Sequence, residues 1–527
     1  MSESDQELNE PNPIDPAEAL GEAGPVVTGE APSEGAQTSD SSEQSVATAA
    51  SRGFLWANVG VVTRYVSALV LAALLARHLD TIDYKVMVTL MIFTFYFDNA
   101  LDLGMGAALV YEQEEGVSER VQVAFTANVI LATILAAVAF FVAPVITSLY
   151  HLEGYNLIFR LLAVIVMLSG LTTIPWALLM RGMDFRSRAA VEVSRDMTRF
   201  VLTVVLVMVG LEAWAIILGL IAAYAVWLVG TWLAIRFRPV LRWNWTIMRE
   251  LFAYAWRMAG TRLLGVLALN GDYLIVGNRS TRRDKYGQDE MSLYYQAFRL
   301  PEFILGAQLN AMSAVLFPMY ARIRSEGRMA MSEAMYRALR LIALFSIPTG
   351  IGLALVARDS IWLMYGTPSP VAIRTMELLS LAGCFVGVGF ASGDLLFAIG
   401  KPGVMARINV VMVPMMLIAM WIVAPRGIVW VATVHLVIAA VFQTARQLIV
   451  NRIIGANTME TIRSLVPALI ISVFVTAFAL PVRLLTHTGL LSMLAIVVAG
   501  VIGGFAGLAL SPAARFELRD VVAKVRG

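Results

Sequence analysis

The chain has 527 residues, of which 58% are hydrophobic and only 15% are charged. Soluble domains average roughly 45–50% apolar and about 25% charged residues, so this composition excludes an ordinary soluble protein. The net charge of +2 hides two unlike parts, because residues 1–50 hold eleven of the 38 acidic residues and none of the 40 basic ones. The tail therefore carries −11 and the remainder +13, and we predict a membrane protein with an acidic N-terminal tail.

The tail itself is rich in Pro, Gly and Ser, and it has no basic, apolar segment of the kind that directs secretion. Such a composition is typical of a disordered segment. We assign the tail no part in catalysis, and partner binding or regulation is the open alternative. The single cysteine, Cys384, and four scattered histidines exclude an intrachain disulfide and a cysteine-based metal site.

Apolar stretches recur from Gly53 to the end of the chain, and about 20 apolar residues are enough to cross a membrane as a helix. We predict an all-α polytopic membrane protein with about fourteen transmembrane helices. The ranges are 53–76, 84–111, 120–149, 156–180, 189–210, 213–236, 251–277, 291–320, 333–356, 370–399, 403–423, 427–450, 464–485 and 489–510.

The longest breaks between these helices predict the domain organisation. Two six-helix lobes are expected around a central cavity, because repeated halves in transporters place the substrate site at their interface. The predicted parts are a disordered acidic tail (1–50), an N-terminal lobe (51–240), a C-terminal lobe (241–455), two additional helices (456–512) and a basic tail (513–527).

The loop charges predict the orientation. Arginines gather in the loops near residues 181–188, 236–242 and 322–328 and in the C-terminal tail, whereas several opposite loops hold one basic residue or none. Basic loops stay in the cytoplasm, so we place both termini there. The basic loop at 279–285 is the exception, since it faces outward in this topology.

Ionisable side chains in the middle of apolar helices cost roughly 2.5–3.5 kcal/mol on insertion scales and are candidates for function. Arg64, Arg262 and Arg299 lie too deep for their side chains to reach the membrane surface, and we interpret them as lining a cavity. Polar side chains on the same predicted helices are further candidates for substrate binding: Asn58, Asn270 and Gln308.

Three acidic residues also lie within predicted helices. Asp98, Asp102 and Asp272 are interpreted either as counter-ions of the arginines or as a coupling site for Na⁺ or H⁺. Asp98 and Asp102 share one helix face at i,i+4 spacing. We expect no other cofactor and no metal site, because clusters of metal-binding side chains are absent from the sequence.

Other charged positions receive a structural interpretation. Arg160 and Arg257 lie within about two turns of a helix end and can reach the membrane surface. The cluster at 192–199 contains Glu192, Arg195, Asp196 and Arg199, and we interpret it as a solvated cytoplasmic extension of its helix.

A cavity lined by arginines favours an anionic cargo. The planar guanidinium donates two hydrogen bonds to phosphate oxygens, so a phosphate-bearing cargo fits best. The sequence contains no G-x-x-x-x-G-K-[ST] loop, which excludes a self-contained ATP-driven pump.

Four short segments, in this order and spacing, resemble a known family. They are Asp102-Leu103-Gly104 with Ala108-Leu109-Val110, the segment from Asp272 to Gly277, the segment from Tyr294 to Pro301, and Val315-Leu316-Phe317-Pro318 with Arg322. The chain resembles the polysaccharide transporter (Wzx-type oligosaccharide flippase) family of the multidrug/oligosaccharidyl-lipid/polysaccharide exporter superfamily. The resemblance covers nearly the whole chain from about residue 52.

The resemblance implies a flippase and not an enzyme. It implies that oligosaccharide repeat units on undecaprenyl diphosphate cross the bacterial inner membrane by alternating access, for exopolysaccharide, capsule or O-antigen biosynthesis. The implied partners are this anionic lipid-linked oligosaccharide, membrane lipids, and a polysaccharide polymerase with its export machinery, and no nucleic acid. The long acidic tail and the basic loop at 279–285 depart from the pattern expected of the family.

Two other functions stay open. A cation-coupled drug antiporter of the same superfamily is disfavoured by the buried arginines, since its cavity should be acidic and aromatic. A membrane polysaccharide polymerase or ligase is disfavoured because no interhelical break exceeds about twenty residues.

Overall fold

The computed structural model describes residues 63–101, 117–182, 184–280, 282–512 and 514–515. The acidic tail and the candidates Asn58 and Asp102 lie outside these residues, as do the first residues of the first predicted helix. The described residues form long helices joined by short turns, as the predicted all-α class requires.

Each of the fourteen predicted ranges contains a helix in the described residues. The first covers residues 63–78. The others are α2 (Thr81–Leu101), α4 (Val117–Leu149), α5 (Asn156–Arg160) followed by α6 (Leu162–Arg181), α7 (Phe185–Met208), α8 (Glu212–Ile235), α9 (Trp245–Arg279), α10 (Glu290–Ile323), α11 (Arg328–Tyr365), α12 (Pro370–Ala398), α13 (Pro402–Val423), α14 (Ile428–Ile454), α15 (Thr458–Leu485) and α16 (Leu490–Leu510).

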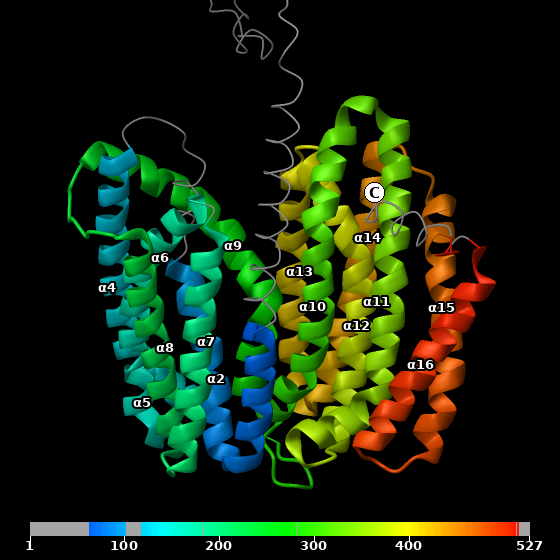
Figure 1. The fold of residues 1–527 in the computed structure, drawn as a ribbon, viewed down its shortest axis with the longest axis horizontal. Coiled ribbons are helices and arrows are strands. Elements are labelled where there is room, and N and C mark those ends of the chain that lie inside the picture. Colours follow the sequence, from blue (N-terminus) through cyan, green and yellow to red (C-terminus); the bar gives the residue numbers. More distant parts are fainter. Residues whose placement is uncertain (1–62, 102–116, 183, 281, 513, 516–527) are drawn as a thin grey trace, which may run out of the picture. The chain divides into compact units, whose positions relative to one another are not determined.

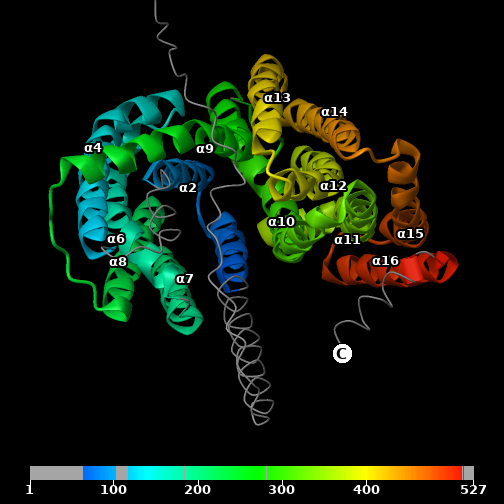
Figure 2. The ribbon, with the colours of Figure 1, turned by 90° about the horizontal axis from the view of Figure 1, so that it is seen from above.

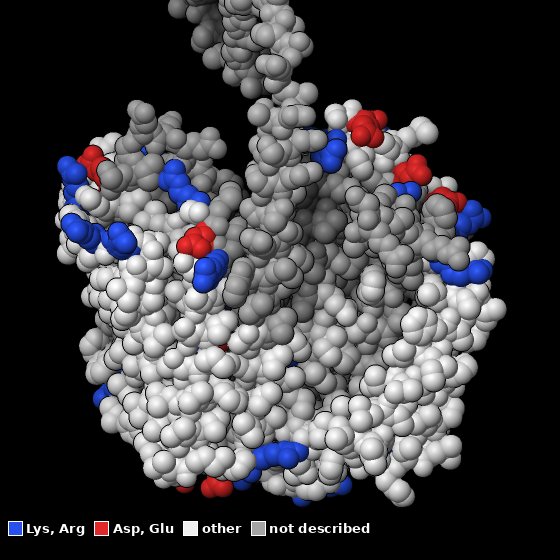
Figure 3. Space-filling view, viewed as in Figure 1, with Lys and Arg blue, Asp and Glu red and all other residues white. Residues whose placement is uncertain are grey.

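Within the described part of the chain, nine helices are long and apolar enough to cross a membrane. They establish a multi-pass membrane protein, while the count of fourteen crossings stays a prediction. Four other long helices in the described residues are not apolar enough to meet this criterion, and they carry most of the ionisable candidates: α2, α7, α9 and α10. Figure 3 shows the same division on one face, where charged side chains gather at the two ends and few lie in the band between them.

The helices form two groups (Figures 1 and 2). In the N-terminal group, α2, α4, α6, α7 and α8 pack against one another, and in the C-terminal group α10 to α14 do so. Helices α15 and α16 pair with each other and with α11, at the outer edge of the C-terminal group (Figure 2). Helix α9 contacts α2 and α4 of one group and α13 and α14 of the other, so it bridges them.

Among the described residues, the two groups share a core at one end of the molecule. At the end that carries the loops around residues 151–155, 280–289 and 424–427, one cluster of buried residues includes Tyr84 and Phe159 from the N-terminal group with Tyr294 and Tyr365 from the C-terminal group. We call this the joined end. At the opposite end, which we call the split end, each group has its own core, around Phe125 in one and around Tyr320 in the other.

Polar contacts between the groups also lie toward the joined end. Lys85 on α2 forms a buried ion pair with Asp289, with 3.2 Å between Nζ and Oδ1. Arg77, on the helix over residues 63–78, donates to the carbonyl oxygen of Leu363 at the end of α11. These contacts and the shared core hold the two groups together at this end, whereas the described residues at the other end form two separate cores.

Candidate functional site

A cavity of about 370 Å³ lies near the middle of the helices, between the N-terminal group and α10. Its wall is built by the helix over residues 63–78 and by α2, α7, α8 and α10. The lining residues are Arg64, Ser67, Ala68, Leu71, Met91, Thr94, Phe95, Asp98, Arg195, Asp196, Arg199, Phe200, Leu220, Ala223, Tyr224 and Arg299. This lining brings four arginines and two aspartates to one space, although they come from four separate helices.

Helix α7 contributes the densest charge. Glu192, Arg195, Asp196 and Arg199 follow the spacing i, i+3, i+4, i+7, which places all four on one face of a helix. Asp184 caps the first turn of this helix by accepting a hydrogen bond of 3.0 Å from the backbone N–H of Ser187. The cap fixes where α7 begins, and the spacing places these four side chains, which we call the charged stripe, on the face of α7 toward the cavity.

The two acids of the α7 stripe are buried and pair with Arg64. The Nη2 atom of Arg64 lies 3.0 Å from Oε1 of Glu192, and its Nε atom lies 3.6 Å from Oδ2 of Asp196. The Arg64 side chain is 41% exposed, so it is held by these acids while part of it faces open space. Arg188 adds a second partner for Glu192 at 3.3 Å.

Arg195 and Arg199 differ in how their charge is balanced. Arg195 lies 2.9 Å from Oδ1 of Asp196 and stacks over the Trp227 ring at 5.3 Å. Arg199 contacts the sulfur of Met91 at 2.7 Å, and among the described residues no carboxylate lies within ion-pair distance of it. A half-buried guanidinium with no carboxylate partner in the described residues is the group in this wall best prepared to take an external anion.

Arg299 lines the same cavity from α10, on the other side of the boundary between the two helix groups, which we call the seam. Its Nη1 atom lies 3.2 Å from Oε2 of Glu302, and its guanidinium lies 5.4 Å from the centre of the Tyr295 ring. Its side chain is 28% exposed, so part of the guanidinium stays accessible. The cavity therefore has arginines from both helix groups, and an anion between them would touch both.

Asp98 lines the cavity without pairing with an arginine in the described residues. Its Oδ1 atom accepts a hydrogen bond of 2.7 Å from Ser169, and its Oδ2 atom accepts one from the Tyr224 hydroxyl. Neutral donors therefore satisfy this carboxyl group without an arginine, and the cavity lining holds four arginines against two aspartates. Such a space suits a phosphate or diphosphate, which guanidinium groups bind in a bidentate manner.

The other candidates lie elsewhere. Asp272 is buried on α9, and the backbone oxygen of Asn270 accepts a hydrogen bond of 2.6 Å from Tyr96. The Oε1 atom of Gln308 is buried without a hydrogen-bond partner in the described residues. None of these three lines the arginine cavity. Arg262 lies in helix α9, and its side chain is outside what the structure describes.

The interpretation of the 192–199 cluster as a solvated extension is wrong. Glu192 and Asp196 are 4% and 9% exposed, and both arginines between and after them line the cavity. The error arose because the cluster lies near a helix end, where charge is usually solvated. The signal that identifies it is the i, i+3, i+4, i+7 spacing, which gathers charge on one face and leaves the rest of the helix apolar.

A second hollow, of about 710 Å³, lies between α10, α11, α15 and α16. We call it the apolar groove. Its lining is almost wholly aliphatic and aromatic, with Thr349 and Ser360 as polar exceptions. Gly500 and Gly504 of α16 face it and leave room, because a Cβ atom at either would only reach ordinary contact distance.

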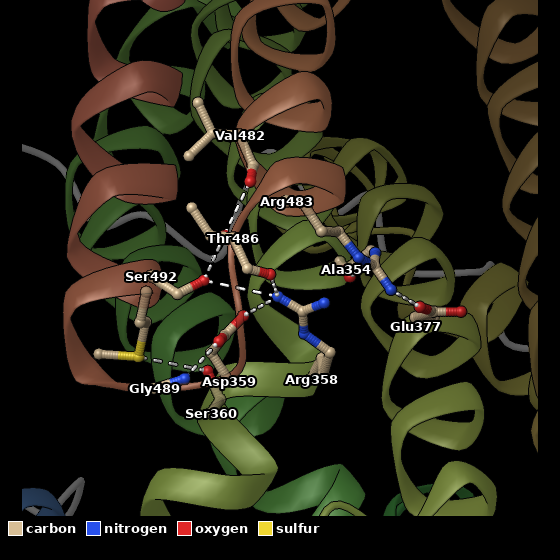
Figure 4. A network of polar contacts seen from close by, with 11 residues as sticks. Ala354, Arg358, Asp359, Ser360, Glu377, Val482, Arg483, Thr486, Gly489 and Ser492 are labelled. Carbon is tan, nitrogen blue, oxygen red and sulfur yellow. Dashed lines mark hydrogen bonds and ion pairs between the residues drawn. The ribbon is translucent and has the colours of Figure 1, made fainter.

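Polar contacts at the joined end fasten the outer wall of the apolar groove (Figure 4). Arg358 on α11 donates to the carbonyl oxygen of Thr486 at 3.0 Å, and the backbone N–H of Gly489 donates to Asp359 at 3.0 Å. Arg483 on α15 donates to the Ala354 carbonyl oxygen at 3.1 Å and pairs with Glu377 on α12. The α15–α16 hairpin is therefore tied to the C-terminal group.

The fold and the two hollows define a class: a multi-pass membrane transporter with a charged central cavity. The described fold is similar to that of the lipid II flippase MurJ in an inward closed conformation, with a TM-score of 0.71 and 13% identity over 89% of this chain and 100% of that one. It is also similar to an inward-facing multidrug resistance MATE family transporter of the MOP superfamily, with a TM-score of 0.58 and 14% identity over 76% of this chain and 94% of that one.

Sequence comparison places the chain within this class. Residues 74–368, more than half of the chain, match the model of a family described as polysaccharide biosynthesis protein, and the chain belongs to that family. It is 19% identical over 66% of its length, and 71% of the relative's, to the teichuronic acid biosynthesis protein TuaB of Bacillus subtilis. It is 22% identical over 53% of its length, and 55% of the relative's, to the succinoglycan biosynthesis transport protein ExoT of Rhizobium meliloti.

Proposed function

We propose that this protein is a flippase that moves oligosaccharides linked to undecaprenyl diphosphate across the bacterial inner membrane. The observation that carries the proposal is the cavity in which Arg64, Arg195, Arg199 and Arg299 meet in the middle of the helices. Transfer of a diphosphate through hydrocarbon is prohibitive unless cations replace its water, and guanidinium groups supply them. Membership of the polysaccharide biosynthesis family supports the sugar-bearing cargo.

The apolar groove supplies a place for the lipid tail. The head group would occupy the arginine cavity while the polyprenyl chain follows the surface of α11, α15 and α16. Burial of a methylene group contributes about 0.8 kcal/mol, so a long prenyl chain in this groove adds substantially to cargo affinity. The two hollows thus match the two chemically unlike halves of one molecule.

Alternating access follows from the joined and split ends. The basic loops near residues 181–188, 236–242 and 322–328 belong to the split end, and the positive-inside rule supports a cytoplasmic location for that end and for both termini. The cavity then lies on the cytoplasmic side of a closed joined end, ready for a head group from the inner leaflet. Release outside requires the Lys85–Asp289 pair and the shared core to open.

A reconstituted flipping assay tests the proposal. Purified protein in liposomes is given a fluorescent polyprenyl-diphosphate sugar, and leaflet exchange is followed by quenching from outside. We expect exchange in the wild type, a strong loss in Arg199→Ala and no loss in Arg160→Ala, whose arginine is exposed and stacks on Phe140 outside the cavity. Sugar-chain extension without exchange would indicate a polymerase, and transport of a cationic drug alone would indicate an antiporter.

A further inference from the structure

Asp272 is a buried carboxyl group at the seam between the helix groups. The residue is 2% exposed. Its Oδ2 atom accepts a hydrogen bond of 2.7 Å from the Tyr294 hydroxyl, and its Oδ1 atom accepts one of 2.9 Å from the backbone N–H of Tyr273. Among the described side chains no Lys or Arg lies within ion-pair distance of it, so it does not act as a counter-ion of the cavity arginines there.

One titratable side chain does face Asp272 from another helix. His435 on α14 places its Nδ1 atom 3.9 Å from Oδ2 of Asp272. This nitrogen is buried and has no hydrogen-bond partner in the described residues. The Phe298 ring lies 6.0 Å from the imidazole and covers one side of it. A small shift of either side chain brings the two polar atoms into hydrogen-bond distance.

The other groups around this pair are mostly neutral. Leu417 of α13 packs on Gly271 beside the aspartate. The titratable side chains beside Asp272 are Tyr294 on α10, which donates a hydrogen bond to it, and Tyr273 on α9, whose ring packs against those of Tyr294 and Tyr295. Tyr96 on α2 approaches through its hydrogen bond to Asn270, Tyr150 after α4 lies against Gly277 of α9, and Arg299 lies over the Tyr295 ring. In the described residues the pair is therefore surrounded mainly by hydroxyl groups and rings.

The number of protons bound to Asp272 and His435 sets the net charge of the pair, and the surrounding dry packing disfavours any net charge. Without a proton, the pair carries a net negative charge in a dry core, which is strongly unfavourable. With one proton, it is neutral, as a carboxylic acid beside imidazole or as a carboxylate beside imidazolium. A second proton would leave a net positive charge. The closed joined end therefore favours one shared proton.

We propose that Asp272 and His435 form a proton-binding site through which one proton per cycle is coupled to the opening of the joined end. The inference rests on the proposed function for its physiological meaning, because it names the coupling ion of that flippase. A proton bound by the pair stabilises the closed joined end. Loss of the proton favours a conformation in which water reaches α9 and α14.

The position of the pair connects it to both helix groups and to the cavity. Two residues before Asp272, the backbone oxygen of Asn270 accepts the hydrogen bond from Tyr96 of α2, so α9 is tied to the N-terminal group at this point. Toward the cavity, the Tyr273 and Tyr295 rings lie 6.1 Å apart, and Arg299 lies over Tyr295. A shift of α9 on proton loss thus reaches the wall that holds the cargo.

A conformational measurement tests the site without any cargo. Spin labels are placed at the joined end of the full chain in lipid nanodiscs, at Leu157→Cys on α5 and Leu491→Cys on α16, in a Cys384→Ala background. Both leucines are well exposed, at 58% and 82%. We expect a distance distribution that shifts to the closed form as pH falls from about 8.5 to about 5.5, by at most about tenfold per pH unit for one proton.

The variants separate a proton site from a structural contact. Asp272→Asn mimics the neutral acid and should hold the closed form at every pH, and His435→Gln should change the midpoint of the transition. Tyr294→Phe should keep the transition with a shifted midpoint. The exposed cap variant Asp184→Asn serves as the matched acid control and should behave as the wild type. An unchanged transition in the Asp272→Asn, His435→Gln double variant would overturn the proposal.

Transport in liposomes then identifies the ion. A pH gradient should drive accumulation of the labelled polyprenyl-diphosphate sugar in one leaflet, and a Na⁺ gradient at constant pH should not. Asp272→Asn should still bind cargo and lose the response to the pH gradient. A response to Na⁺ alone would overturn the proton site. If the wild type moves no such lipid but keeps the pH-dependent distances, the flippase proposal fails and the proton site stands.

Discussion

The arginine cavity and the apolar groove lie in one helix bundle, and the side chains that line them have opposite polarity. The cavity is lined by arginines and aspartates from the helix over residues 63–78 and from α2, α7 and α10, whereas the groove is lined almost wholly by apolar side chains of α10, α11, α15 and α16. The cavity is held by ion pairs within its wall, and the α15–α16 wall of the groove is held to α11 by polar contacts at both ends of α15, between Arg358 and Thr486 and between Tyr336 and Asn457. The two hollows therefore differ in polarity, as the proposed cargo with its diphosphate head group and prenyl tail requires.

The largest expected effect comes from the Lys85–Asp289 pair, which links the two helix groups at the joined end. Lys85→Met leaves a buried carboxylate unpaired, and breaking a buried pair costs about 3–5 kcal/mol. We expect the joined end to open, measured as faster labelling of Tyr84→Cys by a membrane-impermeant thiol reagent. The Lys85→Asp, Asp289→Lys double variant should restore most of the protection. Equal labelling in the double and single variants would contradict a role for the pair in closure.

Arg199→Ala tests the cavity half of the comparison. Hydrogen bonds to charged groups contribute about 1.5–3 kcal/mol, so cargo binding should weaken by roughly ten- to a hundredfold. Arg199→Lys keeps the charge but loses the bidentate geometry and should lie between the wild type and Arg199→Ala. The measurement is binding of a soluble diphosphate-sugar analogue without a lipid tail. Unchanged binding in Arg199→Ala would remove this residue from the site.

Gly500→Leu tests the groove half. The added side chain enters space that Val475 and Ala479 leave open and should displace two or three methylene groups of a prenyl tail, worth about 2 kcal/mol. Binding of long-tailed cargo should fall about tenfold or more, and binding of the tail-free analogue should not change. A matched control is Leu484→Ala, an exposed position on α15 outside the groove. Loss of tail-free binding in Gly500→Leu would show that the two hollows are not separate.

The smallest effect is expected at the cap of α7, which positions the charged stripe of the cavity. The hydrogen bond from Ser187 lowers the pKa of Asp184. The ionised carboxylate therefore stabilises the fold at pH values above the ordinary aspartate pKa, and this stabilisation is lost as the pH falls through the lowered pKa. Asp184→Ala should reduce the free energy of unfolding by about 1 kcal/mol near neutral pH. Asp184→Asn should retain most of it, since asparagine also caps helices. Thermal unfolding in detergent measures both.

The helices were predictable because the cue for them is local. Twenty apolar residues in succession describe a membrane helix whatever surrounds them, and every predicted range contains a helix in the described residues. Arg64, Arg299 and Asp98 could be singled out for the same reason, since each is an ionisable side chain in an apolar segment. Their role in binding stays a prediction, and so do the domain boundaries.

Arg195 and Arg199 show where local reasoning fails. Charge near a helix end is usually solvated, and only the approach of Arg64 from another helix buries the acids of this stripe. The pairing of Asp272 with His435 has no local cue at all, because it depends on how α9 lies against α14.

The sequence by itself determined that this is a polytopic membrane protein with an acidic tail, a basic body and arginines in its helices, because hydropathy and charge are properties of short segments. The tertiary structure decided which of those arginines meet, which acids neutralise them and which end of the bundle is closed. Those outcomes follow from the packing of helices far apart in the chain, and packing depends on the shapes of many side chains together.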